Sequence, residues 1–180
     1  MPANALRIIG GRWRGRKIHF PRAAELRPTP DRVRETLFNW LGQDLTGRTT
    51  LDLFAGSGAL SLEALSRGAT RAVAIDRDAT LVGALRATAD RLGTRDLETH
   101  CADALGFLAR DRRAYDVIFL DPPFADELWE RLLPAAADRL APDGRLYVEA
   151  STPLEAAGGL EIVRRDKAGR VHYHLLRRAG

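Results

Sequence analysis

From residue 49 to residue 150, short apolar runs alternate with amphipathic stretches. The stretches between the runs carry apolar residues at helical spacing, and the last of them contains Pro134, which should kink or divide its helix. We expect these helices at about 58–68, up to Leu92, near Ala104–Arg110 and around Glu127–Leu140. The apolar runs have the length and composition of strands: TTLDLF, RAVAID, LETHC, YDVIFLD and RLYVEA. This alternation predicts an α/β fold, with a parallel sheet covered by helices on both faces.

The N-terminal end of the chain has a different pattern. Residues 6–20 mix short apolar runs with glycines and basic residues, which predicts a β-hairpin or two short strands. A helix should follow, with Thr29 as its N-cap, Pro30 as its first residue and Gly42 at its end. We therefore divide the chain into a basic N-terminal extension, residues 1–42, and a main domain, residues 43–180.

At the other end of the chain the pattern predicts strands and turns. The sequence APDG, at 141–144, is typical of a turn. The tail from 160 to 178 contains two apolar runs separated by DKAG, which predicts an antiparallel pair of strands.

Composition narrows the class of protein. The chain has 180 residues, of which 45% are hydrophobic and 29% charged, as in an ordinary globular domain. It contains neither an apolar run of the ~20 residues that a membrane span needs nor a signal-peptide pattern, so we expect a cytoplasmic protein. The single cysteine, Cys101, excludes an internal disulfide, and His172 and His174 have no partner ligand nearby in sequence, so we expect no metal. A monomer is the default expectation.

Charge is unevenly distributed along the chain. Residues 1–34 carry nine Lys or Arg and two acids, a net charge of +7, and residues 164–178 carry a net +5. Because the whole chain has a net charge of +4, the rest of it stands at −8. Basic flanks around an acidic centre suggest that a polyanion binds the ends while a cationic ligand or chemistry occupies the middle.

A glycine loop, DLFAGSG, runs from Asp52 to Gly58, between the first predicted strand and a helix. It lacks the third glycine of the dinucleotide fingerprint and the Gly-Lys-Ser/Thr of a phosphate loop. The neighbouring acids also disfavour phosphate. Asp76, at the end of the next strand, is placed to accept the two ribose hydroxyls of an adenosine, and Asp103, after the third strand, could hold the adenine amine. A cationic adenosyl ligand without phosphates, S-adenosylmethionine, matches this pattern.

The fourth strand ends in Asp121-Pro122-Pro123-Phe124, at the edge of the sheet where open α/β folds bind ligands. Asp121 and the carbonyl of Pro122 can accept the two N–H groups of an exocyclic base amine, whose lone pair would then point at the methyl donor. Phe124 offers a face on which an extruded base could stack.

Four segments resemble the bacterial small-subunit rRNA guanine-N2 methyltransferases of the RsmD type: RIIGGRWRGRKI, LRPTPDRVRETLFNWL, LDLFAGSGALSLEALSRGA and VIFLDPPF. The resemblance implies a Rossmann-like class I S-adenosylmethionine-dependent methyltransferase fold, seven-stranded with an antiparallel last strand. It also implies transfer of a methyl group to N2 of a guanine in 16S rRNA of the small ribosomal subunit. On this reading the cofactor site comprises Asp52, Phe54, Ala55, Gly56, Ser57, Gly58, Asp76, Arg77, Asp103 and Ala104.

RNA contacts are expected from basic residues near the N-terminus: Arg12, Arg14, Arg16, Lys17, Arg32 and Arg34. Two alternatives share parts of this pattern. An adenine-N6 methyltransferase acting on RNA or DNA can use the same D-P-P-aromatic signature. A non-catalytic ribosome-assembly factor could retain a vestigial cofactor site.

Overall fold

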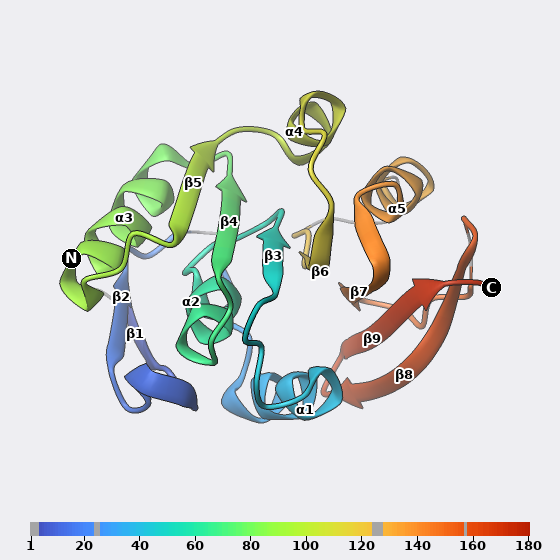
Figure 1. Cartoon of the computed structure of the whole chain (residues 1–180). Coiled ribbons are helices and arrows are strands. Elements are labelled where there is room, and N and C mark those ends of the chain that lie inside the picture. The colour runs from blue at the N-terminus through green and yellow to red at the C-terminus, as the bar shows by residue number, and fades with distance from the viewer. Residues whose placement is uncertain (1–3, 24–25, 124–127, 157) are drawn as a thin grey trace.

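A seven-stranded sheet forms the centre of the computed structural model, which describes residues 4–23, 26–123, 128–156 and 158–180 (Figure 1). The order of its strands is β5-β4-β3-β6-β7-β9-β8. The first five of these are parallel, and β9 is antiparallel to both of its neighbours. The strands are β3 (Thr49–Asp52), β4 (Arg71–Asp76), β5 (Leu97–Cys101), β6 (Tyr115–Leu120), β7 (Leu140–Ala150), β8 (Leu160–Ala168) and β9 (Val171–Arg178). The predicted α/β sheet with an antiparallel last strand is confirmed.

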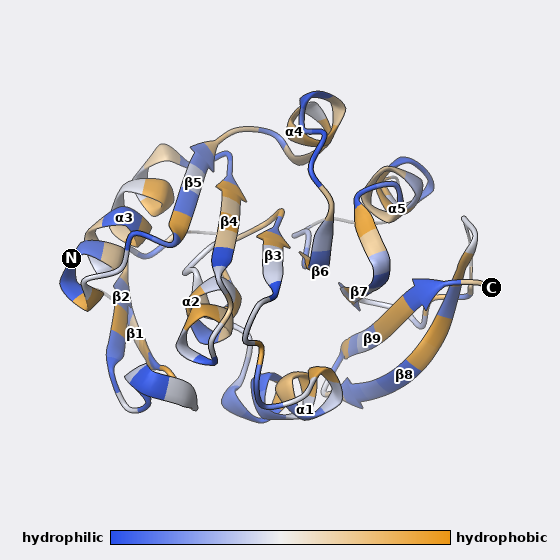
Figure 2. Cartoon of the chain, viewed as in Figure 1, coloured by the Kyte–Doolittle hydropathy of each residue, from blue (hydrophilic) through white to orange (hydrophobic). Residues whose placement is uncertain are grey.

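Helices cover both faces of the sheet because the central strands are apolar on both sides. They are α1 (Asp31–Leu41), α2 (Ala59–Ser66), α3 (Ala79–Leu92), α4 (Ala104–Arg110) and α5 (Trp129–Ala137). Phe119 and Tyr147 point to the face covered by α1, α2 and α3, whereas Ile118 and Leu146 pack against α4 and α5. In Figure 2 the ribbon of β4 is largely hydrophobic, and the helices alternate between hydrophobic and hydrophilic residues. None of the helices in the described segments has both the length and the apolar character needed to cross a membrane.

The N-terminal residues form a small sheet of their own, as the sequence predicts. β1 (Asn4–Arg7) pairs antiparallel with β2 (Lys17–Phe20), and the short 3-10 helix η1 (Gly11–Trp13) lies between them. Trp13 and Ile18 are buried in the same apolar cluster as residues of α1 and α2. The hairpin is therefore packed on the main sheet domain rather than separate from it.

Two local predictions are wrong. Helix α1 begins at Asp31 with Pro30 as its N-cap, and Thr29 hydrogen-bonds elsewhere, to Glu149. The predicted turn at 141–144 lies within β7, where the pairing with β6 jumps from Tyr115–Leu140 to Val117–Arg145. The sequence APDG thus forms an irregularity in a continuous strand, because β6 advances two residues while β7 advances five.

Candidate active site

The glycine loop connects β3 to α2 at the carboxyl edge of the parallel strands. Gly56 and Gly58 have φ values of 54° and 80°, which favour glycine. A Cβ atom on Gly58 would lie 2.2 Å from Cδ1 of Leu85, so the Leu85 side chain would have to shift to make room for it. The backbone N–H of Ala55 donates to the carbonyl of Ile75, and Oγ of Ser57 accepts from the N–H of Ala59. These contacts fix the loop between two strands and a helix start.

Asp76 ends β4 directly beside this loop. One of its carboxylate oxygens accepts a hydrogen bond from the N–H of Gly56 at 2.9 Å, and the other accepts from the N–H of Asp78 at 2.9 Å. The structure therefore brings Asp76 and the glycine loop together, as the sequence predicts.

Asp52 lies at the end of β3, only 2% exposed. Ser61 donates a hydrogen bond to it at 3.1 Å. Burial raises the pKa of Asp52 to about 7, and the negative charges of Asp76 and Glu149 act in the same direction. A buried acid of this kind is costly to ionise unless a cation approaches it.

Asp103 and Ala104 lie at the start of α4. A carboxylate oxygen of Asp103 accepts a hydrogen bond from the N–H of Gly106 at 2.9 Å, so this exposed side chain caps the helix. Arg77 follows Asp76, and its carbonyl accepts a weak hydrogen bond from the thiol of Cys101 at 3.5 Å. The cofactor contacts expected of Arg77, Asp103 and Ala104 stay predictions.

Asp121 follows β6 immediately and is partly buried. Its pKa is raised well above its ordinary value, first by burial and then by the charge of Glu149 and a hydrogen bond to it, with Asp52 adding to the effect. Pro122 is buried and Pro123 is exposed. Phe124, the predicted stacking residue, lies outside the described residues.

Glu149, at the end of β7, is a residue of this site that the sequence pattern did not predict. Because Leu120 of β6 pairs with Val148 of β7, the next residues along the two parallel strands are Asp121 and Glu149. The hydroxyl of Tyr147 donates to Oε1 of Glu149 at 2.7 Å, and the hydroxyl of Thr29 donates to the same atom at 3.4 Å. The available signal was an acid at the end of the apolar run RLYVEA, which the sequence analysis interpreted only as a strand.

The basic residues predicted to contact RNA divide into two groups. Five are exposed in the structure: Arg12, Arg14, Arg16, Lys17 and Arg32. Arg12 lies 4.0 Å from Asp96, and Arg16 donates to the carbonyl of Arg91 at 3.3 Å.

The prediction for Arg34 is wrong. Its side chain is 0% exposed, and its guanidinium forms an ion pair with the buried Glu63 at 3.3 Å and another with Asp31. It also donates to the carbonyl of Arg7 at 2.9 Å. Arg34 therefore holds the N-terminal segment in place and does not present its charge to RNA.

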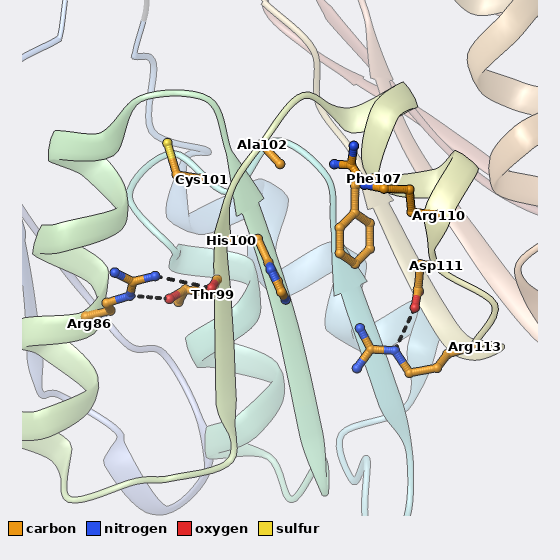
Figure 3. A pocket seen from close by; sticks show the side chains of 9 residues that line it. All are labelled: Arg86, Thr99, His100, Cys101, Ala102, Phe107, Arg110, Asp111 and Arg113. Carbon is orange, nitrogen blue, oxygen red and sulfur yellow. Dashed lines mark hydrogen bonds and ion pairs between the residues drawn. The ribbon is translucent and has the colours of Figure 1, made fainter.

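A pocket of about 450 Å³ lies elsewhere, beside β5 and α4 (Figure 3). In this pocket Arg86 donates to Thr99 at 2.7 Å, and Arg113 donates to Asp111 at 2.8 Å. It is lined by Arg86, Thr99, His100, Cys101, Ala102, Phe107, Arg110, Asp111 and Arg113. The acids at the ends of β3, β4, β6 and β7 are not in its lining, but Cys101 and Ala102 directly precede the candidate cofactor residues Asp103 and Ala104.

The acids around the glycine loop suit a cationic ligand. Asp52 and Asp76 lie beside the loop, and Asp121 and Glu149 lie at the ends of the next two strands of the sheet, β6 and β7. An anionic phosphate would be repelled here, whereas a sulfonium or ammonium group would relieve the cost of the buried carboxylates. The strand order with β9 inserted antiparallel between β7 and β8, together with this loop, defines the Rossmann-like class I methyltransferase fold.

The chain belongs to the family described as Conserved hypothetical protein 95, whose model matches residues 6–177. It is 41% identical to Ribosomal RNA small subunit methyltransferase D of Escherichia coli K12, over 96% of this chain and 90% of the relative. The protein of the same name from Haemophilus influenzae is 37% identical, over 94% of this chain and 92% of the relative. The solved structure of Escherichia coli yhhF superimposes with a TM-score of 0.89 at 38% identity, covering 98% of this chain and 99% of that one. The resemblance to the RsmD-type family is thus confirmed.

Proposed function

We propose that this protein transfers a methyl group from S-adenosylmethionine to the exocyclic N2 of a guanine in 16S rRNA of the small ribosomal subunit. The observation that carries the proposal is the position of Asp121-Pro122 at the carboxyl end of β6, one strand away from the glycine loop that follows β3. The name shared by the relatives, ribosomal RNA small subunit methyltransferase, supports rRNA as the substrate class.

S-adenosylmethionine would supply an electrophilic methyl group on a sulfonium. Asp76 would accept hydrogen bonds from its ribose hydroxyls, and Asp103 would accept one from its adenine amine. Asp52, whose pKa of about 7 reflects burial, would become ionised more readily beside a cation. The N–H groups and tight turns of the loop at Gly56 and Gly58 would allow the ligand to approach the backbone.

Asp121 and Pro122 act on the acceptor amine. An exocyclic amine is a weak nucleophile because its lone pair is delocalised into the ring. A carboxyl oxygen of Asp121 and the carbonyl of Pro122 would accept its two N–H groups and direct the lone pair at the methyl carbon. This contribution is orientation together with electrostatic stabilisation. Phe124 is proposed to stack on the base, at a position outside the described residues.

The exposed basic side chains of the N-terminal extension, residues 1–42, would bind the RNA backbone. Arg14, Arg16 and Lys17 lie on or beside a hairpin that packs on the main domain through Trp13 and Ile18. Phosphate contacts from this rigid support would position the rRNA without reading its sequence.

Label transfer tests the proposal. Purified protein is incubated with methyl-labelled S-adenosylmethionine and either unmodified small ribosomal subunits or naked 16S rRNA. We expect label in rRNA from at least one of the two substrates, and their difference defines which one the enzyme uses. Cofactor binding without label in either RNA would contradict the proposed activity, and a protein that does not bind the cofactor would be the non-catalytic assembly factor.

A further inference from the structure

Two acids, Asp121 and Glu149, lie side by side at the candidate active site, and the proposed methyl transfer gives a role to Asp121 alone. Asp121 and Glu149 occupy neighbouring positions at the ends of the paired strands β6 and β7, and Glu149 is 7% exposed. Two adjacent carboxyls in a buried setting cannot both ionise cheaply, so they share a proton.

Hydrogen bonds determine where that proton resides. Glu149 accepts from the hydroxyls of Tyr147 at 2.7 Å and Thr29 at 3.4 Å, and both bonds favour its ionised form. The pKa of Asp121 is raised by burial, by the charge of Glu149 and by the hydrogen bond between the two acids. Burial raises the pKa of both acids, and the two hydroxyls that donate to Glu149 favour Glu149 as the ionised partner and Asp121 as the neutral acid that donates to it.

We propose that Glu149 is a positioning residue that acts through Asp121 and is the final acceptor of the proton released by methylation. The inference rests on the proposed function and deepens it. The acceptor nitrogen forms a bond to the methyl carbon while the bond from carbon to sulfur breaks. The proton of that nitrogen passes to the free oxygen of Asp121, and the proton already on Asp121 passes to Glu149. Asp121 ends neutral, Glu149 ends protonated, and the positive charge that the donor brought is cancelled.

Other titratable side chains face this pair from the neighbouring strands. Among the described residues these are Asp52 from β3, Tyr147 from β7 and, beyond it, Tyr173 from β9. Asp52 raises the pKa of Asp121, whereas the hydroxyl of Tyr147 lowers the pKa of Glu149. Removing the Tyr147 hydroxyl should therefore make Glu149 easier to protonate while leaving both acids in place.

The first test is the variant Glu149→Gln, compared with Glu161→Gln, which removes a partly exposed acid on β8 that pairs with Arg177. At pH 7 we expect kcat to fall roughly 100-fold in E149Q, as for loss of a proton acceptor, with the KM for S-adenosylmethionine within about twofold of wild type. E161Q should match wild type. A kcat for E149Q equal to or above wild type would overturn the proposal, because Asp121 would then need no partner.

The second test is Tyr147→Phe, which distinguishes a proton role from packing. Because Glu149 must be ionised to accept the proton, we expect the acidic limb of the kcat profile to move to higher pH in Y147F. An unmoved limb in Y147F together with a loss of activity in E149Q would assign Glu149 a packing role and overturn the proposal.

Infrared spectroscopy tests the shared proton without any turnover. The wild-type protein should show a protonated carboxyl band that is lost in Asp121→Asn and that titrates at lower pH in E149Q. Because this measurement needs neither cofactor nor RNA, it stands even if the protein methylates a different acceptor. A spectrum without that band in the wild type would overturn the inference and leave the proposed function untouched.

Discussion

At the scale of single residues, two acids of the site have separate proposed roles: Asp76 would hold the cofactor, and Asp121 would act on the acceptor. Asp76 bonds to the glycine loop, whereas Asp121 lies at the end of β6 beside Glu149. Because Asp76 and Asp121 make separate contacts, their substitution should affect separate steps.

We expect Asp121→Ala to retain cofactor affinity and to lose most methyl transfer, roughly 100-fold or more, because the amine loses an acceptor that orients it. Asp76→Ala should weaken cofactor binding about tenfold or more, since it removes the acceptor for the ribose hydroxyls. Calorimetry of S-adenosylmethionine binding and label transfer to rRNA measure the two steps. Turnover of D121A at the wild-type rate, or unchanged affinity in D76A, would refute the corresponding role.

Asp52 should cost the protein stability at neutral and alkaline pH. Its pKa is about 7 in the folded state, above the ordinary 3.8. The folded state therefore binds a proton at Asp52 more tightly than the unfolded state does. The stabilisation of the folded state that this proton provides is lost as pH rises from about 4 to about 7.

We expect Asp52→Asn to raise the free energy of unfolding by roughly 1–3 kcal/mol at pH 8, with the gain shrinking toward zero below pH 4. Urea denaturation at several pH values measures this difference. A difference that does not depend on pH would mean that Asp52 is not a strained acid.

Sequence reasoning located the loop, Asp76 and Asp121 because each follows a strand whose end is visible in the pattern. It could not find Glu149, because the place of this residue in the site depends on the pairing of β6 with β7 and on the hydroxyls of Tyr147 and Thr29, which lie 2 and 120 residues away in sequence. Arg34 was misassigned for the same reason: its partner Glu63 lies 29 residues further along the chain.

At the scale of elements, Glu63 of α2 connects the N-terminal segment to the main domain. Its 0% exposed side chain accepts hydrogen bonds from the N–H groups of Ile9 and Gly10, at 3.0 and 2.8 Å. It also forms ion pairs with Arg34 at 3.3 Å and Arg67 at 3.1 Å. The buried carboxylate of Glu63 thus connects three segments: the residues that follow β1, helix α1 and the end of α2.

We expect Glu63→Gln to lower the free energy of unfolding by roughly 3–5 kcal/mol, because two buried guanidinium groups lose their counter-charge. Glu35→Gln, at an exposed position of α1, is the control and should stay within about 0.5 kcal/mol of wild type. Urea unfolding of the three proteins decides the matter. Equal midpoints for E63Q and E35Q would show that the cluster is not a structural anchor.

The elements themselves were largely predictable. The bounds of β4, β5 and α4 match the sequence prediction because their apolar periodicity ends at clear boundaries. The start of α1 and the interior of β7 could not be predicted, because they depend on contacts between segments that are far apart in the sequence. Thr29 hydrogen-bonds to Glu149 of β7 instead of capping its helix. Residues 141–144 stay within β7, which pairs with β6 on either side of them, at Leu140 and at Arg145.

At the scale of the whole molecule, the two basic ends lie on opposite sides of the sheet (Figure 1). The hairpin β1–β2 packs beside α3, and the strands β8 and β9 form the other edge. Arg16 contacts the carbonyl of Arg91 at the end of α3, and Arg12 lies 4.0 Å from Asp96, which precedes β5. These basic residues therefore lie toward the amino ends of the parallel strands, whereas the acids of the candidate site lie at the carboxyl ends.

We expect the triple substitution of Arg14, Arg16 and Lys17 by Ala to weaken binding to small subunits and to reduce the salt dependence of the affinity by roughly two to three counterions. Arg131→Ala, at an exposed position of α5, is the control. Binding measured over a series of salt concentrations gives the slope. A slope equal to that of R131A would place the RNA contacts elsewhere.

The chemical identity of the methylated nucleoside decides whether the acceptor is N2 of guanine. RNA labelled by the wild-type protein is digested to nucleosides, and the labelled species is identified by chromatography and mass spectrometry against standards. We expect label in N2-methylguanosine, reduced roughly 100-fold or more when D121A replaces the wild type. Label in N6-methyladenosine would contradict the guanine assignment and identify the protein as an adenine methyltransferase.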